Sequence, residues 1–295
     1  MDREYLKTCN LCGSDQLQCI DPRINLCKCN SCGYIFDNPR PSFEDIQEYY
    51  SRQEKYDVWL EHLPARENLW KRRLEIVNKW KKDGSLLDIG TGIGQFIDIA
   101  RNDFSKVKGT EISSSAIMIA KQRYDLDIIG GAIEQIELEE KFDNITLFHV
   151  LEHVGNPKLV IDKCWNLLNN KGKLIIAVPN DINSFKAILK EFFRKKGLGS
   201  DKSTGMMGLP GIALDGTVDE IHLSHFTTEV LEKFLENENF KVICMGLDPY
   251  FIETGFRRIV KESYYLFNQV VWKIFHRNTY DTILIIAEKK EKLIT

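Results

Sequence analysis

The sequence predicts an α/β fold in which a mostly parallel sheet carries helices on both faces. From Ser85 onward, short apolar runs typical of buried strands alternate with amphipathic helical segments. Such alternation favours parallel strands joined by crossover helices. The first apolar run leads directly into a glycine-rich turn, LLDIGTGIGQF at 86–96. Ligands of open α/β sheets bind at the ends of strands of this kind.

Length and charge narrow the class of protein. A chain of 295 residues can form one ordinary domain and a smaller module. Its net charge is -3 with both signs interspersed, which argues against a nucleic-acid partner. The N-terminal MDREYLKTCN lacks the apolar core of a signal peptide, and no stretch approaches the roughly 20 apolar residues of a membrane span. We therefore expect a cytoplasmic protein without a transmembrane segment.

Six of the eight cysteines lie between residues 9 and 32. Four of them form two C-x-x-C knuckles, each followed by glycine: Cys9, Cys12, Cys29 and Cys32. Two such knuckles supply the four thiolates of a closed tetrahedral zinc site. The spacing predicts a zinc-ribbon module with structural zinc, and a redox-active cysteine pair is the alternative.

The chain divides into three predicted parts. Residues 1–40 form the zinc ribbon, 41–82 a helical cap or linker of two or three helices, and 83–295 the main domain. In the main domain the pattern predicts strands at 85–89, 106–111, 126–129, 143–149, 173–178, 241–245 and 282–288, and helices at 94–102, 114–124, 157–168, 227–237 and 257–277.

Residues 181–225 interrupt this alternation and predict a lid inserted into the main domain. Five apolar side chains of the segment fall on one helical face: Phe185, Ile188, Leu189, Phe192 and Phe193. The pattern favours a helix packed against its own domain, with peripheral membrane contact as the alternative. The aromatic-rich helix at 257–277 is expected to form a wall of the substrate site or a homodimer face.

The glycine turn is compatible with two ligand classes. A dinucleotide fingerprint is G-x-G-x-x-G, whereas Gly90, Gly92 and Gly94 give G-x-G-x-G. The ammonium group of S-adenosylmethionine needs an acceptor, which Asp88 could supply, and its carboxylate needs backbone amides. Glu111, at the end of the second strand, suits ribose hydroxyls in either ligand.

Several motifs together resemble those of class I S-adenosylmethionine-dependent methyltransferases, over roughly residues 40–290. They are LLDIGTGIGQF, TEIS at 110–113, GGAIEQIEL at 130–138, FDNITLFHVLEHV at 142–154 and GKLIIAVPN at 172–180. The resemblance implies a Rossmann-like sheet with an antiparallel last strand. It also implies that the three glycines bind the methionine part of the cofactor, Glu111 the ribose, Ala132 and Ile133 the adenine edge, and that His149 lies near the sulfonium.

The cysteine module narrows the resemblance to zinc-ribbon methyltransferases that modify sugars. Relatives that methylate sugar carbon carry a further C-terminal domain, and this chain ends soon after its last predicted strand. We therefore expect methylation of a hydroxyl oxygen of a sugar, nucleotide sugar or glycan precursor. Alternatives are a phenolic, quinone-like or lipid acceptor, or a cofactor-binding module without turnover.

A hydroxyl acceptor needs a base or a metal ion, because methyl transfer requires loss of its proton. The candidate bases are His222 and His225, in EIHLSHF at 220–226, and His153 after the fourth strand. The alternative for each histidine is a structural hydrogen bond. Three carboxylates, Asp215, Asp219 and Glu220, could hold a divalent cation, although the pattern favours a solvated loop.

Overall fold

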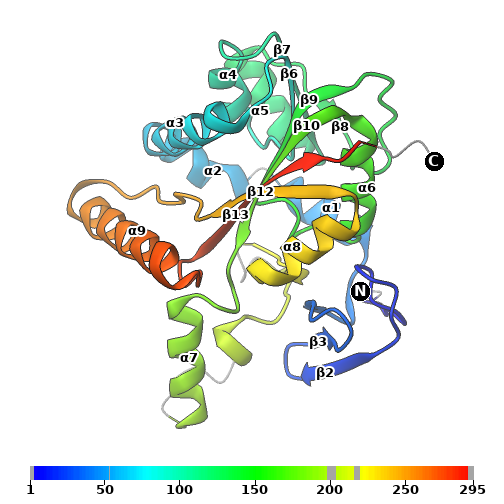
Figure 1. The fold of residues 1–295 in the computed structure, drawn as a ribbon, viewed down its shortest axis with the longest axis vertical. Coiled ribbons are helices and arrows are strands. Elements are labelled where there is room, and N and C mark those ends of the chain that lie inside the picture. Colours follow the sequence, from blue (N-terminus) through cyan, green and yellow to red (C-terminus); the bar gives the residue numbers. More distant parts are fainter. Residues whose placement is uncertain (1–2, 53, 198–203, 216–219, 292–295) are drawn as a thin grey trace.

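The computed structural model describes residues 3–52, 54–197, 204–215 and 220–291 (Figure 1). The strands are β1 (Arg3–Glu4), β2 (Leu17–Asp21), β3 (Leu26–Cys29), β4 (Ile35–Asp37), β5 (Arg40–Pro41), β6 (Ser85–Ile89), β7 (Lys106–Glu111), β8 (Ile129–Gly130), β9 (Phe142–Phe148), β10 (Leu168–Pro179), β11 (Ser224–His225), β12 (Phe240–Gly246) and β13 (Thr282–Lys289). The helices are α1 (Phe43–Tyr50), α2 (Glu54–Glu61), α3 (Leu63–Trp80), α4 (Gln95–Ala100), α5 (Ser114–Tyr124), α6 (Pro157–Leu167), α7 (Phe185–Lys195), the 3-10 turn η1 (Met206–Gly208), α8 (Thr228–Asn237) and α9 (Gly255–Phe275).

A seven-stranded sheet with the order β12-β13-β10-β9-β6-β7-β8 forms the centre of the molecule. Strand β13 runs antiparallel to both of its neighbours, and the β10-β9-β6-β7-β8 pairs are parallel. The predicted mostly parallel sheet with an antiparallel last strand is confirmed. Residues 283–287 of β13 are all buried, as expected for a strand covered on both faces.

Helices cover both faces of this sheet. Helices α6 and α8 pack on one face, where Val160, Leu231 and Leu235 join the apolar core with Leu87 and Ile176. Helices α3 and α4 pack on the other face through Leu74, Val77, Phe96 and Ile97. The two cores lie on opposite faces of the sheet, since Leu87 of β6 belongs to the first and Leu86 to the second.

The cysteine module is joined to the rest of the chain by a second sheet, in the order β11-β4-β3-β2. Three of these strands come from the module, whereas β11 comes from the predicted lid and pairs antiparallel with β4. The module is thus built partly from residues about 190 positions further along the chain. Sequence periodicity could not indicate this pairing, because a two-residue strand has no measurable period.

Two predictions about local structure are corrected. The apolar face of α7 was expected to pack inward, but its five large side chains are exposed and Ala187 and Glu191 are the buried residues. The third strand of the main domain is also shorter than predicted, because β8 contains only Ile129 and Gly130. Parts of the predicted lid, 198–203 and 216–219, lie outside the described residues.

Candidate active site

The turn between β6 and α4 requires glycine at two positions. Gly90 and Gly92 have φ values of 68° and 55°, in the left-handed region. A Cβ atom would lie 2.5 Å from Val150 at Gly90 and 2.8 Å from Trp59 at Gly92. Any larger residue at either position would therefore clash with Val150 or Trp59, and both glycines also line a cavity.

Glu111 at the end of β7 fixes this turn from the next strand. Its carboxylate accepts hydrogen bonds from the backbone N–H groups of Gly92 at 2.8 Å, Ile112 at 2.9 Å and Ser113 at 3.0 Å. Burial raises the pKa of Glu111, and these donors act in the opposite direction. The same side chain lines the cavity, so it can also meet a bound ligand.

The cavity beside the glycine turn has a volume of about 230 Å³. It brings together most of the residues predicted to bind the cofactor: Gly90, Gly92, Glu111, Ala132, Ile133 and His149. Two other predicted residues are not among the described residues that line it. Asp88 is buried and accepts the hydroxyl of Thr146 at 2.6 Å, and burial raises its pKa to about 7. Gly94 begins α4, where an added Cβ would meet Leu126.

The opposite wall of this cavity comes from the helical cap. Tyr56, Trp59, Arg66, Trp70 and Arg73 line it from α2 and α3. No motif spacing links these tryptophans or arginines to the glycine turn, so their place in the site could not be predicted from the sequence. The cap helices are therefore part of the site rather than a linker.

Of the two arginines in this wall, Arg73 is paired with Asp248, whereas Arg66 is not paired with a carboxylate among the described residues. Arg66 is 4 % exposed, its guanidinium stacks 3.8 Å from the ring of Trp59, and its Nε donates to Gln95 at 3.3 Å. Burial lowers the pKa of Arg66. A buried guanidinium without a counter-ion beside a cavity is suited to an anionic ligand group.

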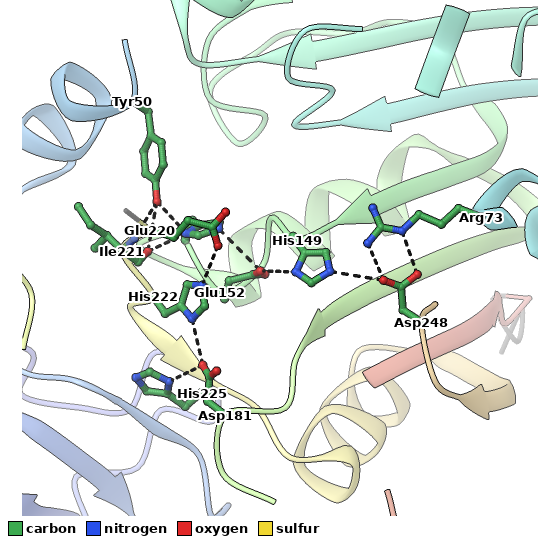
Figure 2. A network of polar contacts seen from close by, with 11 residues as sticks. Tyr50, Arg73, His149, Glu152, Asp181, Glu220, Ile221, His222, His225 and Asp248 are labelled. Atoms are coloured by element: carbon green, nitrogen blue, oxygen red, sulfur yellow. Dashed lines mark hydrogen bonds and ion pairs between the residues drawn. The ribbon is translucent and has the colours of Figure 1, made fainter. Parts of the chain in front are cut away.

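A chain of charged groups crosses the floor of the site (Figure 2). The guanidinium of Arg73 donates two hydrogen bonds to the Asp248 carboxylate, at 2.9 and 2.5 Å. His149, with a φ of 57°, lies between this carboxylate and Glu152, at 3.5 and 3.2 Å. Burial acts to lower the pKa of His149, but the two carboxylates raise it above its ordinary value.

A second cavity, of about 480 Å³, adjoins the first. The two cavities share His149, Glu220 and Tyr250 as lining residues. The second cavity is also lined by the predicted bases His222 and His225. The geometry thus provides two neighbouring compartments, one at the glycine turn and one at the histidine pair.

Asp181 holds both histidines of the second cavity. Its Oδ2 lies 3.0 Å from Nδ1 of His222 and 3.0 Å from Nδ1 of His225 (Figure 2). Nε2 of His225 is in turn 3.2 Å from Asp37, so this ring contacts a carboxylate at each nitrogen. Burial acts to lower the pKa of His225, but these partners raise it to about 9.

The second ring nitrogen of His222, Nε2, lies in a different environment from Nδ1. Nε2 is buried, has no hydrogen-bond partner among the described residues, and lies 3.6 Å from Glu220. The pKa of His222 is raised well above its usual value, because Asp181 and Glu220 outweigh burial. With the Nδ1 proton held by Asp181, Nε2 carries the second proton of the charged ring, and it accepts a proton from an acceptor only once that second proton has left.

His153 lines the first cavity and is held by backbone. Its Nδ1 lies 2.6 Å from the carbonyl oxygen of Ile221 and 2.9 Å from the hydroxyl of Tyr50. A carbonyl oxygen only accepts, so Nδ1 carries the ring proton in the neutral form. Burial lowers the pKa of His153, which favours that neutral form.

The four knuckle cysteines lie close enough to share one metal ion. Their sulfur atoms are all within 4.8 Å of one another, with Cys9–Cys32 at 3.7 Å and Cys12–Cys29 at 3.6 Å. Tetrahedral zinc with sulfur at about 2.3 Å requires separations of about 3.8 Å, which matches. Of the carboxylates considered for a cation site, Asp219 lies outside the described residues, and Glu220 lies 3.6 Å from Nε2 of His222.

The sheet order, the glycine turn and the acidic end of β7 are those of the Rossmann-like class I methyltransferase fold. Residues 59–245 match the family model described as "Methyltransferase domain", and the chain belongs to this family.

Named relatives and solved structures agree with this class. The chain is 34% identical over 106 residues to a ubiquinone biosynthesis O-methyltransferase of Glaesserella parasuis, a match that covers 32% of this chain and 45% of the relative. It thus spans less than half of that relative's length. A solved S-adenosylmethionine-dependent methyltransferase of Thermotoga maritima has a TM-score of 0.52 and 18% identity, covering 83% of this chain and 100% of that one.

A second solved structure shares the fold. It is the complex of the Trm112 methyltransferase activator with a methyltransferase from Haloferax volcanii, with a TM-score of 0.53 and 11% identity over 82% of this chain and 99% of the matched chain. At these identities the structures support the fold alone.

Proposed function

We propose that this protein transfers the methyl group of S-adenosylmethionine to a hydroxyl oxygen of a small-molecule acceptor held in the second cavity. The observation that carries the proposal is the junction of the two cavities at His149, Glu220 and Tyr250, next to Nε2 of His222, which has no hydrogen-bond partner among the described residues. A donor compartment and an acceptor compartment that meet at one wall are the arrangement that in-line transfer needs.

The residues of the first cavity fit the donor. The glycine turn and the buried carboxylate of Glu111 suit its amino-acid and ribose parts, and Ala132 and Ile133 suit the adenine edge. We assign its carboxylate to Arg66, the buried cation without a counter-ion. When bound, S-adenosylmethionine supplies a methyl carbon activated by positive sulfur.

We assign the base to His222, positioned by Asp181. The acceptor oxygen forms a bond to the methyl carbon as the carbon–sulfur bond breaks, and the hydroxyl proton passes to Nε2 of His222. The products are a methyl ether and S-adenosylhomocysteine. His225, held by carboxylates at both ring nitrogens, acts as a positioning residue, and His153 is the second candidate base.

For the acceptor we propose a phenolic or quinone-like hydroxyl. Its support is the relative named a ubiquinone biosynthesis O-methyltransferase. The sugar hydroxyl expected from the cysteine module is the second candidate and rests on that resemblance alone. Apolar residues such as Leu209, Ile212 and Phe251 line the second cavity beside its polar floor and suit a ring.

Methyl-labelled S-adenosylmethionine tests the proposal directly. The purified protein is incubated with the labelled donor and, separately, with polyprenylated catechols and with nucleotide sugars, and products are identified by mass spectrometry. Label on the catechol oxygen is the expected result. Label on a nucleotide sugar would transfer the assignment to sugars. Donor binding by calorimetry without product from any acceptor would favour a non-catalytic module.

A further inference from the structure

Helix α7 presents its apolar side to solvent. Five large side chains are between 41% and 56% exposed, and they are Phe185, Ile188, Leu189, Phe192 and Phe193. The buried residues of the helix are Ala187 and Glu191, and the latter receives Arg194 and the backbone N–H of Met207. This orientation is the reverse of the usual one for a helix on a globular domain.

Helix α9 repeats this orientation over a greater length. It has 21 residues, about 31 Å at the usual rise per residue, and its one buried residue is Asn268. An exposed apolar stripe follows the helical period along nearly its whole length: Phe256, Ile259, Val260, Leu266, Phe267, Val270 and Ile274, each more than half exposed. Isolated exposed apolar residues need no explanation, but a continuous stripe marks an interaction surface.

The two helices lie on the same side of the molecule, at the lower left of Figure 1. Phe185 at the start of α7 donates its N–H to Thr279, which also accepts from Tyr264 of α9. Lys186 and Lys190 of α7 and Lys261 of α9 line the second cavity. Helices α7 and α9 therefore border the compartment assigned to the acceptor through these lysines.

This surface is also basic, although the whole chain is not. The segments 185–196 and 255–277 hold ten lysines and arginines and two glutamates, whereas the chain has net charge -3. Some of these cations form ion pairs, such as Lys186 with Asp281. Five have no ion-pair partner among the described residues: Lys190, Lys196, Arg257, Lys273 and Arg277.

We propose that α7 and α9 dock the protein on the surface of an anionic lipid bilayer. Apolar stripes flanked by lysine and arginine are the pattern of helices that lie in the membrane interface, where the stripe enters the acyl boundary and the cations meet headgroups. A symmetric dimer through the same surface would bring two positively charged faces together, which disfavours a second copy as its occupant. Docking would hold the second cavity next to the bilayer.

Vesicle co-sedimentation of the full chain tests this proposal without reference to activity. We expect binding to phosphatidylcholine vesicles that contain phosphatidylglycerol and little binding to pure phosphatidylcholine. Replacing Phe256, Phe267 and Ile274 with serine should lower the affinity about tenfold or more, because apolar area is lost. The control replaces two exposed apolar residues elsewhere, Met118 and Leu159, with serine.

The charge contribution is tested by Arg257→Gln combined with Lys273→Gln, which should weaken binding to anionic vesicles and reduce its salt dependence. Circular dichroism confirms that each variant is folded. Equal binding to both vesicle types, or the same loss in the Met118 and Leu159 control, would overturn the proposal. The proposal would also be overturned if the parent protein did not bind vesicles and instead formed a stable dimer in sedimentation equilibrium that the α9 variant abolished.

Discussion

Nε2 of His225 lies 3.2 Å from Oδ2 of Asp37, which joins the lid segment to the last strand of the cysteine module. The backbones of the same two segments are also paired. Strands β11 and β4 run antiparallel, with Ser224 opposite Phe36 and His225 opposite Ile35. The hydroxyls of Tyr34 and Ser224 make a further short contact. The cysteine module thus supports the strand that carries His225 and follows His222, and its integrity matters to the site.

Removal of the predicted zinc should therefore affect both stability and turnover. We expect about one zinc per chain by elemental analysis, and a lower thermal unfolding temperature after chelation, because the four thiolates would tie the knuckle at 9–12 to the knuckle at 29–32. Cys29→Ser should reproduce the loss. The exposed Cys19, outside the four-cysteine cluster, provides the control Cys19→Ser. A metal-free protein of unchanged stability would contradict the zinc assignment.

His222→Ala should reduce kcat by about 100-fold or more while leaving donor affinity unchanged, since the base acts on the acceptor proton. Asp181→Asn should also reduce kcat, because the wrong tautomer of His222 would be favoured. Single-turnover kinetics with labelled donor measure both effects. His276→Ala changes an exposed histidine and serves as the control. If His222→Ala keeps near-normal turnover, the base is His153.

Arg66→Leu should weaken donor binding by about tenfold or more, because a buried charge-assisted hydrogen bond to the donor carboxylate is lost. Isothermal titration calorimetry with S-adenosylhomocysteine, which keeps that carboxylate, measures the change. Arg101→Leu removes an exposed arginine paired with Asp98 and should leave affinity unchanged. Equal affinity in Arg66→Leu and the parent would assign the carboxylate to the glycine turn alone.

The raised pKa of His225 predicts a pH dependence of folding. A histidine whose folded pKa is about 9 contributes stability in full below its unfolded pKa near 6.5, and loses it as pH rises toward 9. The free energy of unfolding should fall over this window by up to about 3 kcal/mol from this residue. Urea unfolding of the parent and of His225→Asn at several pH values checks this. Parallel pH profiles for the two proteins would refute it.

Local signals predicted the sheet and the glycine turn, because apolar runs and turn glycines act within a few residues. Glu111 was predictable for the same reason, as a carboxylate at a strand end. Arg66 was not, since its role depends on how a cap helix packs over a turn nearly 30 residues away. Periodicity revealed the apolar side of α7 but could not decide whether it faces inward.

The ion pair between Arg73 and Asp248 constrains how this sequence can change over evolution. The side chains are 2% and 0% exposed and come from the cap and from the loop after β12. Losing either one would leave an uncompensated charge in the interior, a penalty of about 3–5 kcal/mol. A substitution at one position is therefore tolerated mainly together with a substitution at the other. Positions 73 and 248, which lie 175 residues apart, should therefore covary among homologues.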